Sequence, residues 1–290
     1  MQVEKNSPCK VNLILNILGK RPDGFHELET VMQPVPIFDS LQFAKAPDSI
    51  RLTCNHPGLP VDSQNLVFRA AEKFLNAASI PEGVAIHLEK RIPLAAGLGG
   101  GSANAAVTLT GLNELFGSPL SPADLFPLAA ELGSDVPFFL QTNPAIATGR
   151  GEKVVSLEPF PQFHGMHIIL IHPGFGVSTA WAYKNLARFP RDLNGIRGRA
   201  ERLVYSLQSA PIESALPDFY NSLEAPVLEK YPLLAIFQEW LRENGAVAAM
   251  MSGSGSTTFA LARGTESAAV LKEKFIAEFG AFCWLESVAL

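Results

Sequence analysis

The sequence predicts an α+β protein with two domains. Stretches with an apolar residue at every second position indicate strands, and stretches with apolar residues three and four apart indicate helices. The two kinds of segment are interleaved along the whole chain, which is typical of the α+β class. A connection that contains Pro159, Pro161 and Gly165 divides the chain. We therefore expect an N-terminal domain over residues 1–160 and a C-terminal domain over residues 161–290.

The expected elements follow from these periodicities and from turn residues between them. Strands are expected at residues 9–17, 30–35, 84–89, 166–171, 246–251, 257–261 and 282–288. Helices are expected at residues 103–116, from 121 onward, and at 179–186, 222–229, 232–244 and 267–279. In the first strand Lys10 and Asn12 share one face, because side chains alternate along a strand. Gly117 is expected to stop the first helix, and Ser121 to cap the second.

Composition indicates a compact globular protein. The 290 residues are 47% hydrophobic and 18% charged, which excludes a disordered chain. The formal net charge of -5 argues against nucleic acid as an obligatory partner. Phosphate groups can still be bound locally, by backbone dipoles and one or two cations.

The cysteines and the apolar runs bear on the compartment. Cys9, Cys54 and Cys283 are odd in number and far apart, so neither a disulfide framework nor a thiolate zinc site is indicated. The first residues lack the pattern of a signal peptide. No apolar run reaches the roughly 20 residues that span a bilayer. We expect a cytoplasmic protein without a membrane partner.

A glycine-rich segment is the sharpest feature of the sequence. Four glycines fall within residues 97–101, directly before the first expected helix. Glycine lets the backbone approach a ligand closely, and a helix N-terminus attracts anions, so the segment suits a di- or triphosphate. It is neither a Walker A loop nor a GxGxxG fingerprint. The alternative is a flexible turn with no ligand.

Two charged residues stand in apolar surroundings. Asp135 is either a proton acceptor or a helix cap, because an ionised carboxylate flanked by apolar residues needs a partner. Lys10 is either on an exposed strand face or directed into a cleft. If the two meet, each keeps the other charged, and the pair would suit hydroxyl activation for phosphoryl transfer.

Other small or titratable residues give weaker signals. Residues 251–257 are rich in serine and glycine and could form only a tight hairpin. Ser254 lacks the G-x-S-x-G frame of a nucleophile elbow. His164, His167 and His172 have no carboxylate or cysteine at a useful spacing, so we interpret them as strand-end residues and not as metal ligands.

Taken together, these segments resemble the GHMP kinases. Residues 93–104 resemble the phosphate loop Pro-x-x-x-Gly-Leu-Gly-x-x-Ser, and residues 251–258 resemble the C-terminal Gly-Ser-Gly motif. The stretch Lys10-Val11-Asn12-Leu13, residues 19–28 with Pro-Asp-Gly-Phe-His, and Gly-Ser-Asp-Val-Pro-Phe-Phe at residues 133–139 are similar to a subfamily that acts on a cytidine diphosphate sugar alcohol. The resemblance implies the two-domain GHMP kinase fold, with an N-terminal domain like domain 2 of ribosomal protein S5 and a ferredoxin-like C-terminal domain.

The resemblance also implies an activity. The expected reaction is ATP-dependent phosphorylation of the 2-hydroxyl of 4-diphosphocytidyl-2-C-methyl-D-erythritol, on the non-mevalonate route to isoprenoid precursors. Lys10 and Asp135 would be the catalytic pair. Mg²⁺ would bridge the nucleotide phosphates, with Ser102 as its best hydroxyl contact on the protein.

Binding residues are carried over position by position. The ATP site would comprise Pro93, Leu94, Ala95, Ala96, Gly97, Leu98, Gly99, Gly100, Gly101, Ser102 and Ala103, with Asn65 and Lys90 near the adenine. Asn12 would contact the methylerythritol part. Cytosine would lie between Phe25 and Tyr183, and His26 would read its edge.

The chain departs from the family pattern at several positions. Phe25 replaces the usual tyrosine, which keeps a stacking face and loses a hydroxyl. Ala95 and Ala96 stand where glycine is common, and Ala103 replaces a common serine. None of these changes removes the chemistry.

Two other functions remain open from the sequence. Homoserine or mevalonate kinase activity is disfavoured by the segment around Phe25 and His26, because those acceptors have no base to stack. A catalytically silent ligand-binding regulator is disfavoured by the presence of both Lys10 and Asp135. A monomer or a homodimer is expected.

Overall fold

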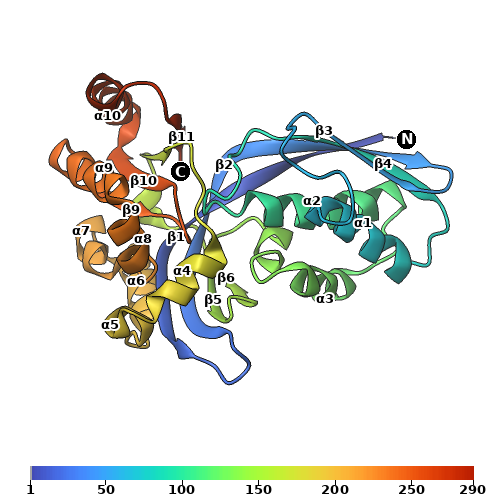
Figure 1. Cartoon of the computed structure of the whole chain (residues 1–290), viewed down its shortest axis with the longest axis horizontal. Helices are drawn as coiled ribbons and strands as arrows, with labels where there is room; N and C mark the ends of the chain where they lie inside the picture. The colour runs from blue at the N-terminus through green and yellow to red at the C-terminus, as the bar shows by residue number, and fades with distance from the viewer. Residues whose placement is uncertain (1) are drawn as a thin grey trace. The chain divides into compact units, whose positions relative to one another are not determined.

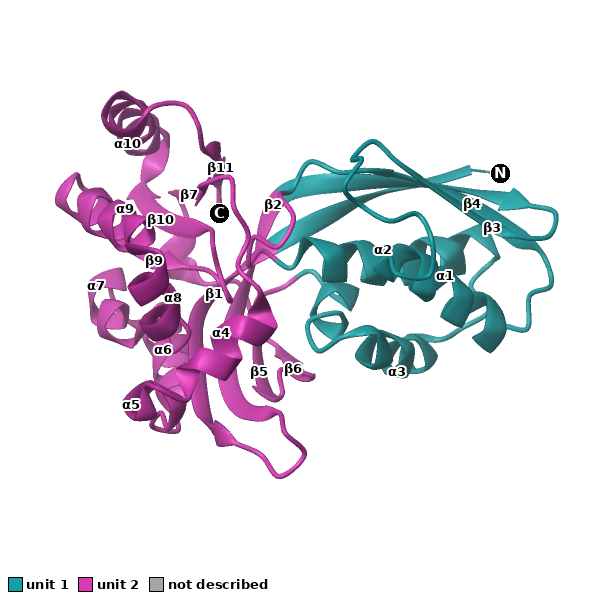
Figure 2. Cartoon of the chain, viewed as in Figure 1, with its two compact units in different colours: residues 1–9, 37–92, 99–142 teal, residues 10–36, 93–98, 143–290 magenta. Residues whose placement is uncertain are grey.

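The structure, a computed structural model, describes residues 2–290. It mixes helices and strands along the whole chain (Figure 1), so the predicted α+β class is confirmed. Two compact units interleave along the sequence (Figure 2). The first contains the residues up to Cys9, Ile37–Ile92 and Gly99–Thr142, and the second contains Lys10–Pro36, Pro93–Leu98 and Asn143–Leu290. Contacts define these units, whereas a domain boundary concerns independent folding. The boundary near residue 160 therefore stays a prediction.

Two long strands contribute to both units. They are β1 (Gln2–Lys20) and β2 (His26–Ala46), and both are much longer than the segments expected at residues 9–17 and 30–35. In the first unit β2 pairs antiparallel with β4, which pairs parallel with β3. In the second unit β1 pairs parallel with β8, and β2 pairs antiparallel with β5, which pairs with β6.

Three helices pack together in the first unit, and α1 also contacts β3 (Figure 1). Helix α2 approaches the sheet closely at Gly111, where a Cβ atom would lie 2.5 Å from the ring of Phe43. Ser121 caps α3 through a capping box with Asp124, as the sequence predicts. The remaining elements of this unit are β3 (Ile50–Cys54), α1 (Leu66–Ala77), β4 (Gly83–Glu89), α2 (Gly100–Leu115), α3 (Pro122–Leu132) and the 3₁₀ turn η1 (Pro137–Leu140).

The second unit contains a four-stranded antiparallel sheet in the order β11-β7-β10-β9. Helices α9 and α10 connect its strands in the β-α-β-β-α-β pattern of ferredoxin-like domains, and pack on it through a core that includes Phe237 and Phe275. The elements here are β7 (Met166–His172), α9 (Pro232–Glu243), β9 (Ala248–Met251), β10 (Thr258–Arg263), α10 (Gly264–Phe279) and β11 (Trp284–Ala289).

Smaller elements complete this unit: β5 (Ala145–Gly149), β6 (Lys153–Ser156), η2 (Pro161–Phe163), α4 (Thr179–Leu186), α5 (Pro190–Leu193), α6 (Arg199–Ser209), α7 (Ile212–Ala215), η3 (Leu216–Asp218), β8 (Tyr220–Asn221) and α8 (Glu224–Lys230). Within residues 2–290, no helix has the length and apolar character needed to cross a membrane.

Candidate active site

Lys10 and Asn12 meet on one face of β1. Both are buried, and the Lys10 ammonium donates a hydrogen bond to Asn12 Oδ1. The Asn12 amide also donates to Thr30 Oγ1 at 2.8 Å, and that hydroxyl donates to a backbone oxygen of β1. The reading of Lys10 as a residue on an exposed strand face is therefore wrong. Its ammonium lies among buried, hydrogen-bonded polar side chains.

The first half of the glycine-rich segment is held by backbone contacts. Leu98 O accepts a hydrogen bond from Lys10 N at 3.0 Å, and Ala96 O accepts one from Thr257 N at 3.1 Å. Ser252 Oγ donates to Gly97 O at 2.9 Å. Residues 252–257 connect β9 to β10, so the second glycine-rich stretch is a hairpin loop that also supports the first.

Gly97 has a positive φ of 78°, and Gly99 one of 69°. A Cβ atom on Gly97 would lie inside van der Waals contact of Ser252 O, so glycine is required there for two reasons. Ala95, at one of the positions where glycine is common in the family, has a positive φ of 50°. This local strain is consistent with a segment shaped to turn its backbone toward a ligand.

The second half of the segment begins helix α2. Gly99 is the N-cap residue, with no side chain to occupy the free backbone amides. Gly100, Gly101 and Ser102 form the first turn, and Ala103 N bonds back to Gly99 O at 2.9 Å. Helix α2 thus starts at Gly100, three residues earlier than expected. Free amides and the helix dipole at this end are what an anion site requires, and phosphate binding there stays a prediction.

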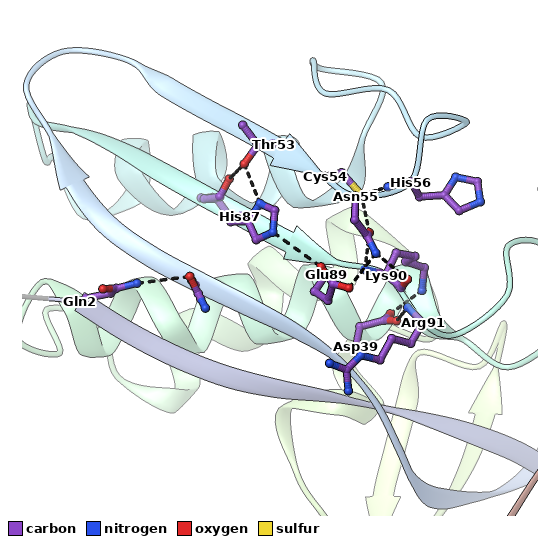
Figure 3. A network of polar contacts seen from close by, with 12 residues as sticks. Gln2, Asp39, Thr53, Cys54, Asn55, His56, His87, Glu89, Lys90 and Arg91 are labelled. Carbon is purple, nitrogen blue, oxygen red and sulfur yellow. Dashed lines mark hydrogen bonds and ion pairs between the residues drawn. The ribbon is translucent and has the colours of Figure 1, made fainter.

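Lys90 forms a buried ion pair with Asp39 (Figure 3). The exposed fractions of the two side chains are 3% and 0%. Backbone atoms of Lys90 are engaged as well, because Asn55 Oδ1 accepts from Lys90 N at 2.7 Å and Asn55 Nδ2 donates to Lys90 O at 3.2 Å. Every polar group of Lys90 therefore has a protein partner, and the predicted adenine contact stays a prediction.

Asn65 has a local structural task. Its side chain caps α1 by accepting a hydrogen bond from Val67 N at 2.9 Å, and it donates to Pro60 O at 2.7 Å. Helix α1 itself was not expected from the sequence. A contact between Asn65 and adenine stays a prediction.

Asp135 lies in a turn between α3 and η1 and is partly exposed. The helix caps on either side of it are Gly133 and Val136. Asp135 belongs to the first compact unit, and Lys10 belongs to the second. The pairing of the two stays a prediction.

The residues expected to hold cytosine lie near the β1–β2 turn. The His26 ring is 5.0 Å from that of Tyr183, centroid to centroid. Burial, with a smaller contribution from the charge of Lys20, lowers the pKa of His26, so its imidazole is neutral at pH 7. Phe25 is 50% exposed, and the Arg150 guanidinium lies 4.5 Å from the centre of its ring.

Two residues that the sequence did not single out support the hairpin loop at 252–257. Asn221 donates to Met251 O and to Gly253 O, both at 2.8 Å. Glu224 accepts from Met251 N at 2.8 Å and from Gln238 at 2.8 Å. Burial raises the pKa of Glu224 to about 7, although both of these hydrogen bonds oppose the rise.

Asp39 and Asn104 were also missed. Both are polar residues within apolar or alanine-rich runs, and that isolation is a signal that could have identified them. Among residues 2–290 there is no cluster of three or more histidine, cysteine, aspartate or glutamate side chains suited to a metal.

Comparison with known proteins places the chain in a family. The N-terminal domain family of GHMP kinases matches residues 65–143, and the C-terminal GHMP kinase family matches residues 205–281. A 4-diphosphocytidyl-2-C-methyl-D-erythritol kinase from Pelotomaculum thermopropionicum is 43% identical, over 90% of this chain and 89% of the relative.

Solved structures agree with this assignment. A crystal structure of 4-(cytidine 5'-diphospho)-2C-methyl-D-erythritol kinase is 35% identical with a TM-score of 0.81, covering 99% of both chains. Homoserine kinase from Cytophaga hutchinsonii is 20% identical with a TM-score of 0.73, covering 99% of this chain and 93% of its own, and shares the fold. The two-domain GHMP kinase fold is thus confirmed. The chain belongs to the GHMP kinase family, and within it to the 4-diphosphocytidyl-2-C-methyl-D-erythritol kinases.

Proposed function

We propose that this protein transfers the γ-phosphoryl group of ATP to the 2-hydroxyl of 4-diphosphocytidyl-2-C-methyl-D-erythritol. The observation that carries the proposal is the 43% identity, over 90% of the chain, to a kinase named for that acceptor. The product would be a precursor on the non-mevalonate route to isoprenoids. In the transfer, a bond forms between the acceptor oxygen and the γ-phosphorus, and the bond from that phosphorus to ADP breaks.

ATP would bind along residues 93–103, with its phosphates at the N-terminus of α2. The glycine N-cap and the free amides of the first turn support this placement. Asn65 and Lys90 would lie near the adenine. Mg²⁺ prefers oxygen ligands and usually keeps several waters and phosphate oxygens, so the Ser102 hydroxyl suits it as a single protein contact. When bound, Mg²⁺ would neutralise charge on the phosphates.

The catalytic pair would be Lys10 and Asp135. Asp135 would accept the proton of the 2-hydroxyl as its oxygen attacks. The Lys10 ammonium would orient Asp135 and stabilise developing negative charge. Its burial beside Asn12 supports this role, because a fixed cation in a water-poor site acts more strongly than one in water.

The acceptor would be recognised at both ends. Asn12 would contact the methylerythritol part, and cytosine would stack between Phe25 and Tyr183. Neutral His26, already beside Tyr183, would pair with the edge of the base. A site that pairs with a base edge rejects other bases, because its own groups are then left unpaired.

We also propose a cytoplasmic location, and a monomer or homodimer with no nucleic acid or membrane partner. The three cysteines are free, which suits a reducing compartment. The net charge of -5 disfavours binding to nucleic acid.

A turnover screen tests the acceptor. The purified protein would be given ATP and Mg²⁺ with the cytidine compound, its uridine analogue, homoserine or mevalonate in turn. Rapid ADP release only with the cytidine compound is the expected result. Equal turnover of the uridine and cytidine compounds would show that the pocket does not read the base, and no ADP release with any acceptor would favour a silent binding protein.

A substitution tests the base. Asp135→Asn should lower kcat by about two to four orders of magnitude, because the amide cannot accept the proton, while ATP affinity changes little. Near-normal kcat in that variant would remove Asp135 from the mechanism.

A further inference from the structure

The carboxylate of Asp39 is fully buried and accepts four hydrogen bonds, two at each oxygen. Oδ1 accepts from Arg91 N at 2.7 Å and from Ile92 N at 2.9 Å. Oδ2 accepts from the Lys90 ammonium and from Asn104 Nδ2, the latter at 2.9 Å. A carboxylate offers about four lone-pair sites. Asp39 is therefore filled by protein donors and is not a metal ligand.

These partners come from the two ends of the glycine-rich segment. Residues 90–92 lie directly before residues 93–103, which contain the segment, and Asn104 follows those residues in α2. Figure 3 shows Asp39 beside Lys90 and Arg91, with Asn55 on the other side of Lys90. One buried side chain thus ties the entry and the exit of the segment together.

The first residue of α2 rests on this arrangement. A Cβ atom on Gly100 would lie 2.9 Å from Lys90 Nζ and 3.2 Å from Ile92 Cγ2. The Lys90 ammonium is therefore packed under the positive end of the α2 dipole, where an unpaired cation is unfavourable. The negative charge of Asp39 offsets this repulsion and holds Lys90 against the first turn.

We propose that Asp39 is a positioning residue for ATP binding, which sets the position of the α2 amides through Lys90 and Asn104. The proposal rests on the proposed function, in which those amides hold the phosphates. Displacing them by about 1 Å can cost a hundredfold in a kinase that depends on positioning. A residue that only stabilised the fold would change the unfolding temperature and leave the affinity of the folded protein for ATP unchanged.

Calorimetry with ATP alone separates these roles. Asp39→Asn should weaken ATP binding by about tenfold to a hundredfold, because Lys90 then lies charged and unpaired beneath α2. KM for the cytidine compound should change little. Glu114→Gln is the matched control, because Glu114 ion-pairs with Lys5 at the far end of α2 and should leave ATP affinity unchanged.

Unchanged ATP affinity in folded Asp39→Asn, with a lowered unfolding temperature, would overturn the proposal. If that variant does not fold, Asn104→Ala serves instead, since it removes the link to α2 and keeps the ion pair. Weakened ATP binding would then support the proposal and unchanged binding would overturn it. Assays of the wild-type protein separate this proposal from the proposed function. If the wild-type protein binds ATP but does not phosphorylate the cytidine compound, the proposed acceptor is wrong. The ratio of the ATP affinities of the variant and the wild-type protein would still decide the role of Asp39.

Discussion

The two halves of the glycine-rich segment are held in place by different physical means. Residues 95–98 are fixed by uncharged hydrogen bonds, from backbone amides and from the hydroxyl of Ser252. The end that leads into α2 is fixed by the buried Asp39–Lys90 ion pair and by the backbone amides of residues 91 and 92, which donate to the Asp39 carboxylate. Both arrangements fix the course of the backbone, but they differ in what a single substitution does.

An uncharged hydrogen bond contributes about 1 kcal/mol net, and its loss leaves a modest defect. A buried ion pair leaves a charge without its partner when one side is removed, and that defect is several times larger. The comparison therefore predicts that the half fixed by uncharged hydrogen bonds tolerates a single substitution better than the half fixed by the buried ion pair. The first half is vulnerable only where its backbone geometry excludes a side chain, as at Gly97.

The largest expected difference is in stability. Lys90→Met should lower the free energy of unfolding by about 3–5 kcal/mol, because it strands the buried Asp39 carboxylate. Ser252→Ala should lower it by only about 1–2 kcal/mol. Urea denaturation of both variants measures the contrast. Lys73→Met, at the exposed Lys73–Glu131 pair, is the control for losing a lysine and should change stability by less than about 1 kcal/mol. Equal losses for Lys90→Met and Ser252→Ala would break the comparison.

A second test uses Glu224, which accepts a hydrogen bond from Met251 N, next to Ser252. Because its folded pKa is raised to about 7, it favours folding while it is protonated. This contribution to the free energy of unfolding is fully present below the unfolded pKa of 4.5 and is lost as pH rises through 7. The total loss is about 3 kcal/mol. Glu224→Gln can keep both hydrogen bonds and should remove this loss. Unfolding curves at pH 5 and pH 8 for both proteins are the measurement, and an identical pH slope in the variant would contradict it.

The smallest effect isolates the geometry at Gly97. Gly97→Ala should lower the free energy of unfolding by about 1–3 kcal/mol more than Gly117→Ala does. The Gly97 variant should also bind ATP more weakly than the Gly117 variant. Both glycines have a positive φ, of 78° and 81°, so both alanines carry the same backbone strain. Only Gly97 faces Ser252 O, while Gly117 has nothing within 4 Å of an added Cβ. Parallel calorimetry with ATP would show the difference, and equal affinities would mean that the close approach to Ser252 is not needed.

Much of the fold was predictable from local pattern. Strong periodicity and turn residues marked α4 within its observed bounds, and the capping box of α3 was read from Ser121. Helices α1 and α6 were missed. Strand β2 was predicted far too short, because a proline-containing stretch hid its continuation toward Ala46.

Part of the candidate site was likewise predictable from the sequence and part was not. The glycine-rich segment and Lys10 with Asn12 were identified because their residue types are unusual for their surroundings. Asp39 is also isolated among apolar residues, but its partners Lys90 and Asn104 are remote in sequence and meet it only in the folded chain. Asn65 illustrates the reverse: a residue selected for a ligand contact turned out to have a capping partner two residues away.

The interleaved course of the chain has a consequence for how this protein is made. Strand β1 leaves the ribosome long before its partner β8, which consists of Tyr220 and Asn221, and the loop that supports Gly97 comes later still. Contacts this distant in sequence form slowly, because the closure of a long loop must precede them. During synthesis the N-terminal strand therefore waits with an unpaired edge, a state prone to aggregation. Expression in a host with ample chaperone capacity should accordingly raise the soluble yield of this protein more than that of a kinase whose units are contiguous in sequence.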